Sequence, residues 1–185
     1  MNTDTNINTN TKTKQMTLTA LAAAVICILS PFTIPIPISP VPVSLTVFAV
    51  CITAYVLGTK LGLIATALYI LIGLVGIPVF SGFSGGVAKL LGPTGGYIIG
   101  YLFVALFTGL FAGHFEEKIF MHAVGMVLGT VICYLLGTIW LAETADIGFK
   151  AALAAGVLPF IPADIVKILA ALFAGGKLRK APRRM

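Results

Sequence analysis

Apolar residues gather in six segments along the chain, separated by short polar corners or by stretches rich in proline and glycine. The segments cover residues 17–30, 42–58, 61–80, 97–113, 119–141 and 150–175. A membrane-spanning helix needs about 20 mostly apolar residues, so several of these segments lie near the lower limit of a span. The pattern predicts an all-α membrane protein built as a compact bundle of six transmembrane helices.

Composition narrows the class of protein further. Of the 185 residues, 58% are hydrophobic and 10% are charged, whereas a soluble domain carries about 25% charged residues. A water-soluble globule is therefore excluded. Six spans use about 120 residues, which leaves no room for a soluble catalytic or nucleotide-hydrolysing module.

The two ends of the chain differ from the apolar middle. Residues 1–16 are polar and rich in Asn and Thr, which predicts a disordered cytoplasmic tail. A cleavable signal peptide is the alternative, but no small-residue cleavage site follows the apolar stretch, which runs into prolines instead. Residues 177–185 form a basic cytoplasmic tail, and residues 17–176 are predicted to be one transmembrane substrate-binding domain.

Basic residues lie unevenly between the segments. With both termini inside the cell, nine cations fall on the cytoplasmic side and two, Lys89 and Lys150, fall outside. The nine are Lys12, Lys14, Lys60, Lys118, Lys177, Arg179, Lys180, Arg183 and Arg184. Because cytoplasmic loops carry an excess of Lys and Arg, this bias predicts a multi-pass protein of the cell membrane with cytoplasmic N and C termini. The placement favours a topology signal over a nucleic-acid site.

Two outer connections are long and apolar. The proline segment, PFTIPIPISPVPVS at residues 31–44, cannot be helical, and the glycine segment, SGFSGGVAKLLGPTGG at residues 81–96, permits unusual turns. Irregular backbone at membrane depth has to be buried in protein or line a cavity. We therefore expect both segments to cap a ligand cavity at the outer end, although linkers lying on the membrane surface are the alternative.

Asp164 and Lys167 are the ionisable residues that stand out inside an apolar segment. A charge at mid-membrane costs about 2.5–3.5 kcal/mol, but at a spacing of three residues these two share a helix face and offset part of that cost. Pro162 suits a first helical turn, which would place Asp164 near a helix start, where free N–H groups favour anions. The pair predicts a polar ligand site; an ion pair that only fixes helix packing is the alternative.

Other chemistry is sparse. The chain has neither a phosphate-binding loop nor a hydrolase motif, and its three cysteines show no metal or disulfide spacing. We expect no cofactor, no metal and no enzymatic activity. An intramembrane enzyme that uses Asp164 and Lys167 as acid and base, or a purely structural subunit, stays open as an alternative.

Four stretches together resemble the BioY family, the biotin-binding S components of energy-coupling factor (ECF) transporters. They are PVPVSLTVFAV, GIPVFSGFSGG, LLGPTGGYIIGY and LPFIPADIVK, and the resemblance runs from Thr17 to Gly176. Two positions depart from the family pattern. Thr46 stands where a glutamine is common, and Ala163 replaces a glycine before Asp164.

The resemblance implies a subunit that captures biotin at the outer face and works with a transmembrane T component and two ATPase subunits. It assigns Ala20 and Ala24 of the first helix to docking the T component. For biotin we expect Asp164 to accept from the ureido N–H groups and Lys167 to donate to the ureido oxygen or to the carboxylate. The remaining shell is expected from Phe80, Gly85, Gly86, Thr94, Gly95, Gly96 and Tyr97.

Overall fold

A computed structural model describes residues 3–37, 39–115 and 118–180. Predicted features at residues 1–2, 38 and 181–185, which include Arg183 and Arg184, lie outside the described residues. Over the described ranges the chain forms seven helices and one antiparallel pair of strands, in the order α1 (Thr3–Leu29), β1 (Thr33–Ile34), β2 (Val43–Ser44), α2 (Thr46–Leu74), α3 (Val87–Leu91), α4 (Gly95–His114), α5 (Ile119–Thr144), α6 (Phe149–Gly156) and α7 (Ile161–Lys180).

The helices suit a membrane in length and composition. Among the described residues, four are long and apolar enough to span it: the Lys12–Leu29 part of α1, and α2, α4 and α5. Helices α6 and α7 meet at a bend of 47° and make a fifth candidate span when they are taken together as one broken helix. The predicted class, an all-α membrane protein with several spanning helices, is confirmed.

Helix α2 contains a sharp reversal at Gly58. This residue has φ 80° and ψ 179°, a conformation that glycine adopts far more readily than other residues. A Cβ placed on Gly62 would lie 2.7 Å from the Cα of Ala54, whereas eight residues of a continuous helix span about 12 Å. The contact requires that the chain folds back, so the predicted corner between residues 58 and 61 is present and α2 consists of two arms.

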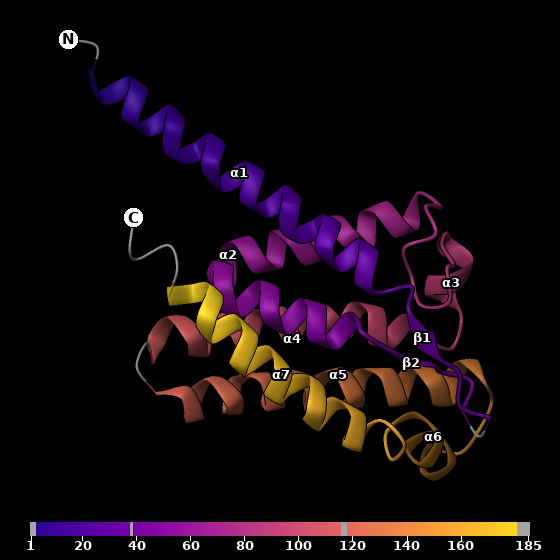
Figure 1. Cartoon of the computed structure of the whole chain (residues 1–185). Coiled ribbons are helices and arrows are strands. Elements are labelled where there is room, and N and C mark those ends of the chain that lie inside the picture. Colours follow the sequence, from indigo (N-terminus) through magenta and orange to yellow (C-terminus); the bar gives the residue numbers. More distant parts are fainter. Residues whose placement is uncertain (1–2, 38, 116–117, 181–185) are drawn as a thin grey trace.

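The molecule has two distinct ends (Figure 1). At one end lie the start of α1, the Gly58 corner and the end of α7, where Arg179 Nη2 donates to the carbonyl of Ala112 at 2.7 Å. At the other end lie the strand pair, α3 and α6. The basic residues Lys60 and Lys177 belong to the first end, and Lys89 and Lys150 to the second.

The proline and glycine segments contact each other at the second end. Strands β1 and β2 pair Thr33 with Ser44 and Ile34 with Val43, so the proline segment is extended as predicted. The N–H of Gly82 donates to the carbonyl of Pro31 at 3.1 Å, and the rings of Phe32 and Phe83 meet edge to face, 5.7 Å apart. The glycine segment differs from prediction in one respect, since it contains the short helix α3.

Residues 3–16, for which the sequence predicted a disordered tail, belong to helix α1 in the structure. The apolar residues from Thr17 onward start the helix, and each further residue then adds one backbone hydrogen bond at little cost. The predicted basic tail likewise begins within α7, which continues to Lys180. Contacts of Arg179 with Ala112 and with the ring of Tyr55 hold this last turn.

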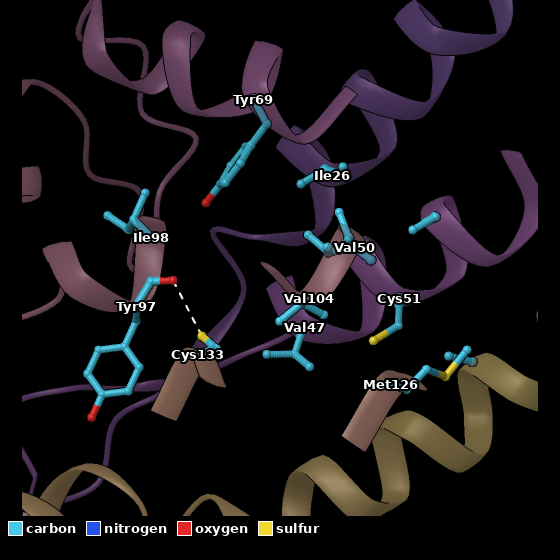
Figure 2. Close-up of a cluster of buried hydrophobic side chains, with 14 of the residues drawn as sticks. Ile26, Val47, Val50, Cys51, Tyr69, Tyr97, Ile98, Val104, Met126 and Cys133 are labelled. Atoms are coloured by element: carbon cyan, nitrogen blue, oxygen red, sulfur yellow. Dashed lines mark hydrogen bonds between the residues drawn. The ribbon is translucent and has the colours of Figure 1, made fainter. Parts of the chain in front are cut away.

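Small residues set the close packing of α4 against α5. A Cβ on Gly129 would lie 2.8 Å from the Cα of Val104, and one on Gly100 would lie 2.7 Å from the sulfur of Cys133. Val104 and Cys133 belong to the buried core in Figure 2, where the Cys133 thiol points to the carbonyl of Tyr97. The close approach of these backbones is what brings α5 side chains near the start of α4.

Candidate functional site

Asp164 and Lys167 form a buried ion pair on α7. The Nζ atom of Lys167 donates to Oδ1 of Asp164 at 2.6 Å. Only 4% of Asp164 and 8% of Lys167 is exposed. Two charges withdrawn from solvent in this way require partners that satisfy their remaining hydrogen-bonding capacity.

The start of α7 places the carboxylate as the sequence predicted. The helix begins at Ile161 with Pro162 as its second residue, and Asp164 lies in the first turn. The N–H of Asp164 donates to the carbonyl of Phe160 at 2.8 Å. The bend between α6 and α7 falls just before this turn, so the carboxylate lies beside a break in the helical backbone.

Tyr134 of α5 supplies the second partner of the carboxylate. Its hydroxyl donates to Oδ2 of Asp164 at 2.5 Å. This residue was not predicted from the sequence, because a single tyrosine in an apolar run is a weak signal and Asp164 is 30 residues away along the chain. A polar hydroxyl in the middle of a predicted span is the one clue that the sequence offered.

A small cavity adjoins the ion pair. Its volume is about 30 Å³, more than the ~10–15 Å³ that one ordered water needs. Its walls come from the proline segment, α2, α4, α5 and the start of α7, and they are Val41, Pro42, Ser44, Val47, Tyr97, Tyr101, Cys133, Tyr134, Phe160, Asp164 and Lys167. The pair therefore lines a small cavity that five parts of the chain build together.

A second, smaller cavity continues from the first. The two share Val41, Pro42, Ser44, Tyr97 and Tyr101 in their walls. The second adds mostly polar or aromatic side chains from α2, the glycine segment and α4, namely Thr46, Tyr69, Ser81, Thr94 and Ile98. Thr46, which departs from the family pattern, thus lies beside this space, and its hydroxyl is 2.8 Å from that of Ser44.

Tyr97 contributes its ring to both cavities, while its hydroxyl serves the fold. The hydroxyl donates to the carbonyl of Gly156 at 2.9 Å and so fixes the end of α6 against α4. Figure 2 shows the ring pointing away from the core cluster. A Cβ on Gly137 would overlap this ring, which explains the need for glycine there.

Five of the predicted site residues are absent from the walls of these two cavities, and four of them pack closely against neighbouring backbone or rings. A Cβ on the fifth, Gly86, would meet nothing within 4 Å, and its φ of 86° is what favours glycine there. A Cβ on Gly85 would meet the carbonyl of Ile77 at 2.5 Å, and one on Gly96 would overlap the Cβ of Trp140. The five are Phe80, Gly85, Gly86, Gly95 and Gly96. Their part in ligand binding stays a prediction, and their visible role is to shape the outer end.

Phe80 illustrates this packing role. It is fully buried, with its ring edge to face with that of Tyr69 at 5.5 Å. A Cβ on Gly73 would overlap the Phe80 ring. The side chain anchors the glycine segment to the second arm of α2.

The remaining polar features are few. Lys89 of α3 is half-buried, and this burial lowers the pKa of its ammonium group. In the part of the chain that the structure describes, no group of three or more His, Cys, Asp or Glu side chains is placed to hold a metal ion. Ala20 and Ala24 are exposed on α1, beside the exposed Leu21 and Ile28.

Comparison with known proteins decides the family. The family model described as "BioY family" matches residues 2–184. The chain belongs to the BioY family. The resemblance of the four sequence stretches is thereby confirmed over nearly the whole chain.

Relatives in the BioY family are transporters. The chain is 40% identical to the probable biotin transporter BioY of Pyrococcus horikoshii over 74% of this chain and 79% of the relative. It is 40% identical to the biotin transporter BioY of Thermotoga maritima over 74% and 80% of the two chains. These names give no support to the alternative of an intramembrane enzyme.

A solved structure shares the fold. The crystal structure of the S component for biotin from an ECF-type ABC transporter matches with a TM-score of 0.86 and 33% identity. The match covers 92% of this chain and 93% of the other. The fold is therefore that of an ECF S component.

Proposed function

We propose that this chain is the biotin-binding membrane subunit of an ECF-type transporter and that Asp164 and Lys167 bind the vitamin. The observation that carries the proposal is the buried ion pair in the wall of a small cavity, in a chain whose relatives are biotin transporters.

The chemistry of biotin suits these walls. Its ureido group offers two N–H donors and one carbonyl acceptor, and its bicycle and side chain are apolar up to the terminal carboxylate. Asp164 accepts from the ureido N–H groups, Lys167 donates to the ligand, and Tyr97, Tyr101 and Phe160 contact the apolar part. Charge-assisted hydrogen bonds in a site with little water are among the stronger polar contacts.

Ligand entry requires movement of the outer segments. A cavity of about 30 Å³ is far below the 300–1,000 Å³ of typical small-molecule sites. The proline segment forms one wall of both cavities, and the glycine segment is bonded to it through Gly82 and Pro31. We infer that these segments cap the site and separate from it to admit biotin.

In the proposed topology α1, each arm of α2, α4, α5 and the α6–α7 pair each cross the membrane once. These six crossings put both termini on one side, and the excess of basic residues assigns that side to the cytoplasm. The exposed face of α1 around Ala20 and Ala24 docks the transmembrane T component, and two ATPase subunits supply the energy. The outer end captures biotin from outside the cell.

Calorimetry on the purified protein tests the function. Wild type should bind biotin, and Asp164→Asn should bind it at least tenfold more weakly while it remains folded. Native mass spectrometry of protein purified from cells should show a retained species with the mass of biotin. Unchanged affinity in a folded Asp164→Asn protein would overturn the assignment of this residue, and an absence of biotin binding by wild type would overturn the function.

A further inference from the structure

We propose that Tyr134 is a positioning residue for the ligand, which acts by holding the Asp164 carboxylate in its binding orientation. This inference rests on the proposed role of Asp164 in biotin binding. Its starting point is the short hydrogen bond from the Tyr134 hydroxyl to Oδ2, at 2.5 Å.

Two donors fix the carboxylate from two different helices. Lys167 of α7 holds Oδ1 at 2.6 Å and Tyr134 of α5 holds Oδ2. Lys167 lies on the same helix as Asp164, so it moves with the carboxylate and cannot fix it relative to the rest of the bundle. Tyr134 makes that connection, because its own helix packs against α4, which carries Tyr97.

The arrangement leaves room for a ligand. A carboxylate has about four lone-pair positions, and Lys167 and Tyr134 use one on each oxygen. The positions that remain can accept the two N–H groups of a ureido ring. Tyr134 therefore orients the acceptor without consuming its capacity to bind.

The location of Tyr134 adds a second reason to hold the carboxylate. A larger groove of about 440 Å³ lies between α5 and the α6–α7 pair. Tyr134 and Asp164 line both this groove and the ligand cavity. The groove walls are otherwise almost wholly apolar, and Val131, Leu135 and Ile165 on them are about half exposed. The hydroxyl of Tyr134 gives Oδ2 a polar partner beside this groove, where the carboxylate would otherwise face apolar side chains.

Removal of the hydroxyl tests the inference. Tyr134 lines both the cavity and the groove, and Tyr134→Phe keeps its ring and removes only the donor. We expect biotin affinity measured by calorimetry in detergent or nanodiscs to fall about tenfold, the size of one hydrogen bond to a charged group. Tyr55→Phe is the matched control, because it also removes a buried hydroxyl bond, to Nδ1 of His122 at 3.0 Å, at the opposite end of the molecule; it should leave affinity unchanged.

A double-mutant cycle with Asp164→Asn separates positioning from direct contact. If Tyr134 acts through Asp164, Tyr134→Phe should have no further effect on affinity in a protein that already carries Asp164→Asn. The infrared carboxylate band of Asp164, identified by its loss in Asp164→Asn, should shift in Tyr134→Phe and stay in place in Tyr55→Phe. A purely structural role would lower the melting temperature and leave this band unchanged.

Each outcome bears on one proposal. Unchanged affinity in a folded Asp164→Asn protein would overturn the proposed role of Asp164, and with it this inference. A weakened Asp164→Asn protein with an unchanged Tyr134→Phe protein would overturn the role of Tyr134 alone. Additive losses in the double variant, or an unshifted carboxylate band, would also overturn positioning through Asp164.

Discussion

The Asp164–Lys167 pair couples the stability of the fold to the proposed chemistry of the site, because each member depends on the other. Each charge is almost fully buried and each is the main ionic partner of the other. Removing one partner leaves an uncompensated charge, which costs about 3–5 kcal/mol of stability, whereas replacing both by neutral side chains is close to neutral. Binding and folding can therefore be separated by comparing single and double substitutions.

Lys167→Met is expected to lower the free energy of unfolding by about 3–5 kcal/mol and to weaken biotin binding, because Asp164 loses its cation. The double variant Asp164→Asn, Lys167→Met should regain most of the stability and still bind poorly. Thermal unfolding in detergent and calorimetry measure the two effects. Biotin affinity of the double variant equal to that of wild type would show that the pair serves packing only.

For single residues, the sequence predicted the Asp164–Lys167 pair but not all of the side chains that surround it. Asp164 and Lys167 stand out because charges are costly within a span. Tyr134 and Tyr101 reach the same cavity from α5 and α4, a proximity that depends on helix packing and not on sequence spacing. The glycines were expected near the ligand, but Gly85 and Gly96 are explained by close backbone approach.

Helix α5 illustrates how elements are held at close range. Gly129 faces backbone atoms of α4, with 2.8 Å between its Cβ position and the Cα of Val104, whereas a Cβ on Gly113 of α4 would meet nothing within 4 Å. The same added methyl group thus has opposite consequences at the two positions. At Gly129 the effect of an added methyl group on stability is set by packing against α4 and not by helix propensity.

Gly129→Ala should destabilise the protein by about 1–3 kcal/mol, since α4 and α5 have to separate. Gly113→Ala is the matched control and should be neutral or stabilising by up to about 1 kcal/mol, because alanine favours a helix over glycine. Thermal unfolding of both variants in one detergent compares them. Equal melting temperatures would contradict the close-packing account.

Element boundaries were predicted best where the backbone itself imposes them. Prolines excluded helix from the segment that holds β1 and β2, and the corner predicted after residue 58 coincides with the reversal at Gly58. The second arm of α2 ends at Leu74, six residues before the predicted end at residue 80. Hydrophobicity did not mark that end, because Phe80 is buried outside a helix.

Basic residues lie at both ends of the molecule, so the orientation of the protein in the membrane can be measured by labelling one position at each end. Lys60 and Lys150 are exposed and belong to opposite ends. In intact cells, Lys150→Cys should react with a membrane-impermeant maleimide and Lys60→Cys should react only after permeabilisation. The native cysteines are buried or half-buried, and replacing them by serine removes their background. The reverse labelling pattern would invert the proposed topology.

The exposed face of α1 predicts a partner contact that is separate from ligand binding. Ala20→Trp with Ala24→Trp should abolish co-purification of the T component, because small side chains permit close helix approach. Biotin affinity of the isolated subunit should remain unchanged. Ala170→Trp, at an exposed position of α7, is the control and should retain the partner. Retention by the α1 variant would place docking elsewhere.

The bond between the Gly82 N–H and the Pro31 carbonyl, together with the contact of the Phe32 and Phe83 rings, has a kinetic consequence. Neither outer segment can swing aside alone without losing a backbone hydrogen bond and an aromatic contact to the other. Under the proposed capping role, we therefore expect the two segments to open as one unit and a single barrier to govern both arrival and departure of a bound vitamin. Weakening either segment should then shorten the residence time of the complex.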